Sequence, residues 1–143
     1  MKLSHQLTLA YCTNVRLPSE RAHGHQIAQV CEALGRLGHE VTIFAPFRRN
    51  VVTKDFWSYY GVSPHIQLQH LGAFDPIASS LLPGVSGLLF LNAMLRRNLR
   101  RALNVLNFDV LYTRTPALLS PLLATNVPVI LELHQLPRRS KRL

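Results

Sequence analysis

Leu7-Thr8-Leu9-Ala10-Tyr11-Cys12 and Val41-Thr42-Ile43-Phe44-Ala45 are the two segments that decide the fold. Each is a short apolar run of the kind that forms a strand buried on both faces. The segment between them starts a helix at about His23 and is predicted to end it at Gly38. The apolar positions of that helix are three or four residues apart and form one face: Ile27, Val30, Cys31, Leu34 and Leu37. A strand, a helix and a strand in this order predict a right-handed parallel crossover.

The same alternation continues along the rest of the chain. We predict further strands at 65–71, 110–113 and 128–134, helices at 54–60, 84–107 and 116–125, and a loop at 72–80. The strand at 65–71 alternates polar and apolar residues, which favours an edge position with one polar face. The sequence therefore predicts an α/β fold with an open parallel sheet flanked by helices.

Length and composition exclude several classes of protein. The chain has 143 residues, of which 48% are hydrophobic, so we expect one folded domain and not a disordered chain. Cys12 and Cys31 are the two cysteines, which excludes a disulfide scaffold and a cysteine-rich zinc module, and both are predicted to be buried reduced thiols. Residues 1–6 do not resemble a signal peptide, so we expect a cytoplasmic protein, or one peripheral at the inner membrane face.

The formal net charge of +9 allows nucleic acid, an anionic membrane or a phosphorylated ligand as partner. No zinc-finger pattern and no aromatic RNA-binding motif is present, so we expect no nucleic acid. The long helix at 84–107 carries much of this charge. Its predicted core stripe is Leu88, Leu91, Leu95, Leu99, Ala102 and Leu106, and its outward face carries Leu89, Phe90 and Ala93 and then Arg96, Arg97, Arg100 and Arg101.

Two interpretations of this helix remain open. It is either a core helix with a solvated charged end, or a helix whose Phe90 and four arginines contact an anionic membrane or a lipid-linked acceptor. A transmembrane span is disfavoured, because the apolar run after Gly84 is shorter than the roughly 20 residues that a span needs.

The expected ligand site lies at the carboxyl ends of the strands, as in open α/β sheets generally. This rule selects the loops at 13–25, 114–115 and 134–139. Gly24, at a helix start, permits close approach of a phosphate or sugar oxygen to free backbone N–H groups. His134, at the end of the last strand, is a candidate to bind a sugar hydroxyl or transfer a proton. No pair of histidines has the spacing of a metal site, so we expect no metal.

Four segments resemble the N-terminal domain of family 4 glycosyltransferases, which have the GT-B fold. The first covers residues 13–24 and continues through 26–27 and 31–34 to Leu37-Gly38-His39-Glu40-Val41. The others are residues 55–62, residues 109–114 and Pro128-Val129-Ile130-Leu131-Glu132-Leu133-His134. The resemblance implies a Rossmann-like sheet of about five strands in the order 3-2-1-4-5. It also implies an acceptor-binding domain that faces a separate C-terminal domain across a cleft, where the C-terminal domain holds a nucleotide-sugar. Family members generally retain the anomeric configuration and need no metal, so the resemblance implies a metal-independent hexosyltransferase without a cofactor.

The resemblance also assigns roles to individual residues. His134 matches a histidine that contacts the transferred sugar, and Gly24 matches a loop glycine that approaches the donor. Asn14, Arg16 and Arg114 lie in the flanking loops and are candidates to bind acceptor or phosphate. The expected substrates are a nucleotide-sugar and a sugar or lipid-linked acceptor.

Some features depart from the family pattern. The first loop has one glycine, Gly24, where two are common, and Gln135 stands where an acidic residue is common. The E-x7-E motif of the C-terminal domain has no counterpart, because Glu32 and Glu40 have that spacing but lie in the first crossover. We therefore expect residues 1–143 to be one incomplete N-terminal domain, inactive without a donor-binding domain or subunit. A membrane- or partner-binding module and a non-functional remnant are the alternatives.

Overall fold

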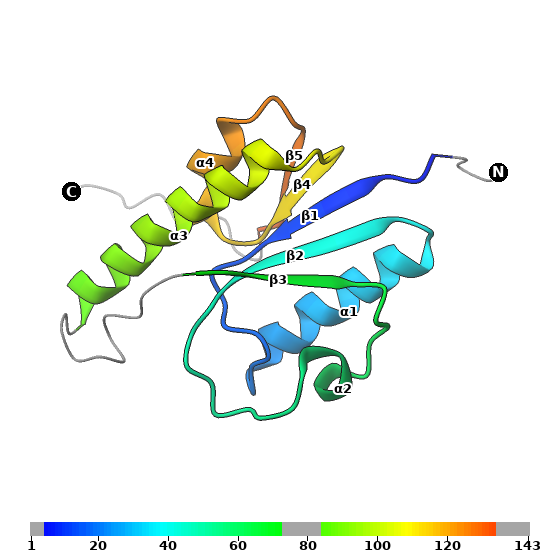
Figure 1. Ribbon diagram of the computed structural model, residues 1–143, viewed down its shortest axis with the longest axis horizontal. Helices are drawn as coiled ribbons and strands as arrows, with labels where there is room; N and C mark the ends of the chain where they lie inside the picture. The colour runs from blue at the N-terminus through cyan, green and yellow to red at the C-terminus, as the bar shows by residue number, and fades with distance from the viewer. Residues whose placement is uncertain (1–4, 73–83, 134–143) are drawn as a thin grey trace, which may run out of the picture.

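The computed structural model describes residues 5–72 and 84–133, which form a five-stranded parallel sheet (Figure 1). The strands are β1 (Thr8–Cys12), β2 (Glu40–Pro46), β3 (Gln67–Leu71), β4 (Val110–Thr113) and β5 (Val129–Leu131). Their order in the sheet is β3-β2-β1-β4-β5, and all neighbouring pairs are parallel. The predicted fold class, the strand order and the edge position of β3 are confirmed.

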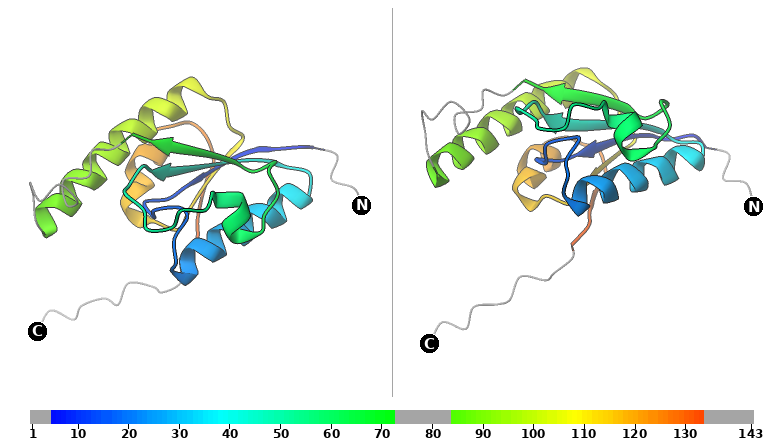
Figure 2. Two further views of the ribbon diagram at one scale, coloured as in Figure 1. Left: turned by 60° about the horizontal axis from the view of Figure 1, so that its bottom comes forward. Right: turned by 90° about the horizontal axis from the view of Figure 1, so that it is seen from below.

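Helices cover both faces of this sheet (Figures 1 and 2). α1 (Ala22–Arg36) and α2 (Phe56–Tyr60) lie on one face, and α3 (Val85–Val105) and α4 (Leu119–Leu123) lie on the other. A short 3-10 turn, Pro116–Leu118, leads into α4. Each crossover from one strand to the next passes over one face, which is the arrangement that the β-α-β pattern predicts.

Two hydrophobic layers result, and the side chains of β1 alternate between them. Leu9 and Tyr11 pack in the layer under α1, whereas Ala10 and Cys12 pack in the layer under α3 and α4. This double burial is why β1 is a continuous apolar run. Cys31 lies in the α1 layer, and both cysteines are free and fully buried, as predicted. Burial raises the pKa of the Cys12 thiol to about 12 and raises that of Cys31 as well.

Local signals set the ends of the short elements. Gly38 follows the end of α1 with φ +93° and Gly61 ends α2 with φ +64°, a conformation that glycine adopts without strain. The Asp55 carboxylate caps α2 by accepting a hydrogen bond from the backbone N–H of Ser58 at 2.9 Å. Leu37, predicted on the buried face, lies just beyond the last residue of α1 and is 74% exposed.

The predicted core stripe of α3 is correct in the middle of the helix and wrong at both ends. Leu91, Leu95 and Leu99 are buried and Ala102 packs partly buried beside them, while Leu103 and Gly87 are buried although they were not predicted. Leu106 is exposed because the helix ends at Val105 and Leu106 is already extended.

Leu88 is exposed for a different reason. A helix of this length spans about 30 Å, whereas a five-residue strand spans about 17 Å. The first turns of α3 therefore project beyond the ends of the strands, as all views show (Figures 1 and 2).

The other differences from the sequence prediction concern segment ends. The predicted strand at 65–71 begins at Gln67, and the predicted strand at 128–134 is ordered as β5 over Val129–Leu131. The predicted loop at 72–80 lies almost entirely outside the described residues. The predicted site residue His134 also lies outside them.

Asp109 joins the start of β4 to the start of β1. Its carboxylate accepts hydrogen bonds from the backbone N–H and the hydroxyl of Thr8, both at 2.8 Å. These two donors lower the pKa of Asp109, because they favour the ionised form. Stability from this contact is therefore present above the ordinary carboxyl pKa of about 4 and is lost as the pH falls through the lower native value.

We predict that Asp109→Asn makes the melting temperature less sensitive to acid. The wild-type chain should lose melting temperature between pH 6 and pH 2.5 in part because Asp109 gains a proton, and the amide has no such proton to gain. The measurement is thermal unfolding by circular dichroism across this range. Glu40→Gln, an exposed change of the same kind, is the control and should keep the wild-type slope. An equal slope in Asp109→Asn and wild type would contradict the prediction.

Candidate functional site

The parallel pairing of β1 with β4 brings two of the predicted loops together. Cys12 is in register with Thr113, and the Thr113 hydroxyl donates to the Cys12 carbonyl at 2.8 Å. Two residues further on, the Thr115 hydroxyl donates to the Asn14 amide oxygen at 3.3 Å. The loops after these strands therefore meet, although about 100 residues separate them in sequence.

A hollow of about 290 Å³ opens at this meeting point. Its walls come from the loops after β1 and β4 and from the first turns of α1: Thr13, Asn14, Val15, His23, Ile27, Arg114, Thr115 and Pro116. Asn14 and Arg114, both predicted as site residues, lie in its wall. This is the carboxyl edge of the sheet, where open α/β folds bind ligands.

Arg114 is mostly buried, with 15% of its side chain exposed. Its Nε lies 3.5 Å from Oε1 of Glu132, the residue that directly follows β5, and the two groups form an ion pair. The second Glu132 oxygen accepts a hydrogen bond from the Tyr112 hydroxyl. Within the described part of the chain, Nε and Nη1 of Arg114 are buried without a hydrogen-bond partner. Arg114 is thus a cation at the wall of the hollow, and the Glu132 carboxylate that pairs with it also accepts a hydrogen bond from a phenol.

Two stacked tyrosines lie behind Arg114. The rings of Tyr11 and Tyr112 are 4.9 Å apart between centroids. Burial and the hydrogen bond to Glu132 raise the pKa of Tyr112 to about 12, and burial raises that of Tyr11 further. Both phenols therefore stay protonated at neutral pH and do not offset the charge of Arg114.

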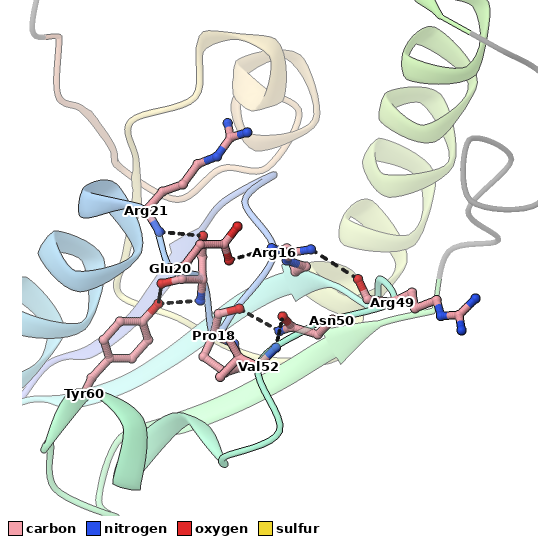
Figure 3. A network of polar contacts seen from close by, with 9 residues as sticks. Arg16, Pro18, Glu20, Arg21, Arg49, Asn50, Val52 and Tyr60 are labelled. Atoms are coloured by element: carbon pink, nitrogen blue, oxygen red, sulfur yellow. Dashed lines mark hydrogen bonds and ion pairs between the residues drawn. The ribbon is translucent and has the colours of Figure 1, made fainter.

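A second hollow of about 340 Å³ adjoins the first and shares Asn14, Val15 and His23 with it. Its other walls are Arg16, Ser19, Glu20, Arg21 and Arg48. Arg16, the third predicted loop residue, forms an ion pair with Glu20 at 2.7 Å and donates to the Arg49 carbonyl at 3.4 Å (Figure 3). The backbone of Glu20 and the Arg16 guanidinium lower the pKa of the Glu20 carboxyl. Arg16 therefore holds the loop after β1 against the loop after β2.

Tyr60 fixes the same loop from the other side (Figure 3). Its hydroxyl accepts from the backbone N–H of Ser19 at 2.7 Å and donates to the carbonyl of Ser19 at 2.9 Å. The Asn50 side chain also holds this loop in place. Its amide donates a hydrogen bond to the Pro18 carbonyl at 2.6 Å and accepts one from the backbone N–H of Val52 at 3.0 Å. Residues distant in sequence thus set the path of residues 16–21, of which Arg16, Ser19, Glu20 and Arg21 line the second hollow.

Gly24 lies at the centre of this packing. It is in the first turn of α1, is buried, and its N–H donates to the Arg21 carbonyl at 3.0 Å. A methyl group placed there would overlap the Tyr60 hydroxyl and would lie 3.1 Å from Cβ of Ser19. The structure therefore gives this glycine a packing role, and contact with a donor phosphate stays a prediction.

Several lining residues were not predicted from the sequence. Glu20, His23 and Thr115 lie in the selected loops but carry no further signal, and Arg48 lies in the loop after β2, which was not selected. Tyr60 lies at the end of the helix predicted at 54–60, but its hydrogen bonds to Ser19 have no local signature in the sequence.

The predicted membrane residues lie on α3, on the other face of the sheet. Phe90 is 43% exposed and Leu89 is 65% exposed. Arg96, Arg97, Arg100 and Arg101 are all exposed. In the part of the chain that the structure describes, no helix is both long and apolar enough to cross a membrane. Over the same residues, no three histidine, cysteine or acidic side chains gather as a metal site would require.

Comparison with known proteins identifies the family. The model of "Glycosyltransferase Family 4" matches residues 24–143, so the chain belongs to this family. Among curated proteins, none matches.

Two solved structures share the fold at low identity. The apo structure of UGT2 from Phytolacca americana superposes with a TM-score of 0.64 and 14% identity, and the match covers 89% of this chain and 29% of that one. The C-terminal domain (residues 78–226) of PF1911 hydrogenase from Pyrococcus furiosus superposes with a TM-score of 0.56 and 14% identity, covering 90% and 91% of the two chains. The chain thus spans less than a third of the UGT2 protein, and at this identity the likeness concerns the fold.

We predict that Gly24→Ala destabilises the protein and that Tyr60→Phe suppresses part of this effect. The alanine methyl collides with the Tyr60 hydroxyl, which phenylalanine lacks, so the two changes should couple by about 1 kcal/mol or more. Urea unfolding of both single variants and the double variant measures the coupling. Gly35→Ala, at a position on α1 with open space around it, is the matched control and should not destabilise. Strict additivity of Gly24→Ala and Tyr60→Phe would contradict the packing role.

Proposed function

We propose that this chain is the acceptor-binding part of a glycosyltransferase that moves a sugar from a nucleotide-sugar to an acceptor. The observation that carries the proposal is the pair of adjoining hollows at the carboxyl edge of the sheet, joined at Asn14 and His23. Family membership supplies the class of reaction. The proposal includes a second, donor-binding domain, on a longer chain or a partner, which would close over this edge.

The residues of the hollows suit hydroxyl-rich and anionic groups. The Asn14 amide can donate to a sugar hydroxyl while its oxygen accepts from Thr115. Arg114 places a positive charge at the wall, and a partly buried cation stabilises phosphate or developing negative charge more strongly than an exposed one does. His134, outside the described residues, is proposed to contact the transferred sugar, as the family resemblance implies.

We predict that sugar transfer requires both a donor domain and this site. The assay incubates the chain, with and without a co-expressed family 4 donor domain, with a panel of nucleotide-sugars and acceptors. Asn14→Ala and Arg114→Gln should each lower kcat/KM about tenfold or more, since each removes one charged or polar contact of about 1.4 kcal/mol to the transition state. Circular dichroism checks that both variants fold.

Arg36→Gln is the control for this assay, because Arg36 is a surface residue of α1 outside both hollows. It should leave transfer within about twofold of wild type, a difference below 0.5 kcal/mol. No transfer in either condition across the whole panel would contradict the proposal and would favour a chain without catalytic function.

A specific observation supports a second role, attachment to an anionic membrane surface. The first turns of α3 project beyond the sheet and expose Leu89 and Phe90, and four arginines follow within three turns (Figure 2). An exposed apolar turn next to cations is the arrangement of interfacial helices. The projecting turns lie at the carboxyl edge, so such attachment would bring a lipid-linked acceptor near the hollows.

We predict that the chain co-sediments with vesicles containing phosphatidylglycerol and not with neutral vesicles. Leu89→Ser combined with Phe90→Ser should weaken binding at least tenfold, because burial of two such side chains contributes more than 1.4 kcal/mol. Changing Arg96, Arg97, Arg100 and Arg101 to Ala should weaken it as well. Val51→Ser, another exposed apolar position, is the control. Unchanged binding of the arginine variant would rule out this role.

A further inference from the structure

A third cavity, of about 440 Å³, lies between α3 and α4 and shares no residue with the two hollows. Its walls are four arginines, two neutral polar residues and two small apolar ones: Arg96, Arg97, Arg100, Arg101, Asn104, Ser120, Pro121 and Ala124. We call it the arginine groove. The sequence pattern placed the arginines on one helix face, but only the packing of α4 against α3 turns that face into a concave site.

The charge of the arginine groove is not balanced by its own elements. Neither α3 nor α4 contains an aspartate or a glutamate. The ion pairs between Glu20 and Arg16, Glu32 and Arg36, and Glu132 and Arg114 lie outside the groove. Arg96 and Arg100 are four residues apart, as are Arg97 and Arg101, and like charges at this spacing destabilise a helix. An anion bound between these arginines would reduce their repulsion and so stabilise α3.

The chemistry of the lining selects the anion. Guanidinium groups bind phosphate oxygens in pairs, with two parallel hydrogen bonds each. The Ser120 hydroxyl and the Asn104 amide add neutral donors of the kind that complete a phosphate site. A carboxylate has two oxygens and one charge and would leave most of these donors unused, whereas a phosphate monoester or diphosphate offers more oxygens and more charge.

We propose that the arginine groove binds a phosphate monoester or diphosphate group. The group can belong to a soluble molecule or to a lipid headgroup, and the chemistry of recognition is the same for both. The proposal does not depend on sugar transfer or on the apolar turn of α3, because none of the residues that line the hollows and neither Leu89 nor Phe90 is involved.

The test titrates the 143-residue chain with inorganic pyrophosphate by isothermal calorimetry. We expect one saturable site in the wild type and at least tenfold weaker binding for Arg97→Gln combined with Arg101→Gln. The control is Arg49→Gln combined with Lys54→Gln, which removes the same charge at exposed positions outside the groove. It should bind within twofold of wild type. Equal weakening of the two double variants, or no saturable binding by the wild type, would overturn the proposal.

Thermal unfolding separates loss of binding from loss of folding. Without ligand, the Arg97→Gln and Arg101→Gln variant should melt at or above the wild-type temperature, because it loses like-charge repulsion and keeps good helix formers. Pyrophosphate should raise the melting temperature of wild type and control, and not that of the groove variant. A groove variant that melts lower but responds to pyrophosphate like wild type would overturn the proposal.

Vesicles then distinguish the source of the phosphate. Retention on phosphatidic acid vesicles above phosphatidylglycerol vesicles of equal content, with release by pyrophosphate, would support a lipid monoester. Pyrophosphate binding without this preference would support a soluble ligand. A polynucleotide that binds far more tightly than pyrophosphate at equal phosphate concentration would overturn the assignment to a compact phosphate group.

Discussion

Strand β1 pairs in parallel with β2 on one side and with β4 on the other, and the placement of both hollows depends on this double pairing. Cys12 is in register with Phe44 and with Thr113, so β1 and β4 end at one level of the sheet, and β2 ends two residues further on, at Pro46. The loops that follow then contact one another through side chains, Asn14 with Thr115 and Arg16 with the Arg49 carbonyl. Strand pairing thus determines where the site lies, and the side chains of the loops determine its chemistry.

Most of the fold could be predicted because its signals are local. The runs at 7–12 and 41–45, the three- and four-residue spacing from Ile27 to Leu34 and the glycines at 38 and 61 each act within a few residues of the feature they determine. The wrong predictions arise where a hydrophobic spacing continues past the end of a helix, or past the strands that would cover it. Leu88 lies on the apolar face of α3, but α3 is longer than the strands beneath it and no sheet covers that turn. Leu37 and Leu106 continue a helical spacing beyond the last helical residue.

The candidate site could be predicted only in part, because its contacts join residues far apart in sequence. The rule that ligands bind at strand ends selected Asn14, Arg16 and Arg114, and the structure brings Asn14 to a common wall with each of the other two. Nothing in the sequence near Gly24 indicates that Tyr60 occupies the space its side chain would need. The binding role of Gly24 and the role of His134 remain predictions, and the concave form of the arginine groove needed the packing of α4 against α3.

Cys12 and Cys31 can report separately on the two hydrophobic layers of the protein. One thiol lies in the layer under α3 and α4 and the other in the layer under α1, and a raised thiol pKa keeps both unreactive while the layers stay closed. The rate at which each cysteine becomes alkylated therefore measures how often its own side of the sheet opens. Comparing the two alkylation rates therefore shows whether the layer under α1 and the layer under α3 and α4 open together or independently.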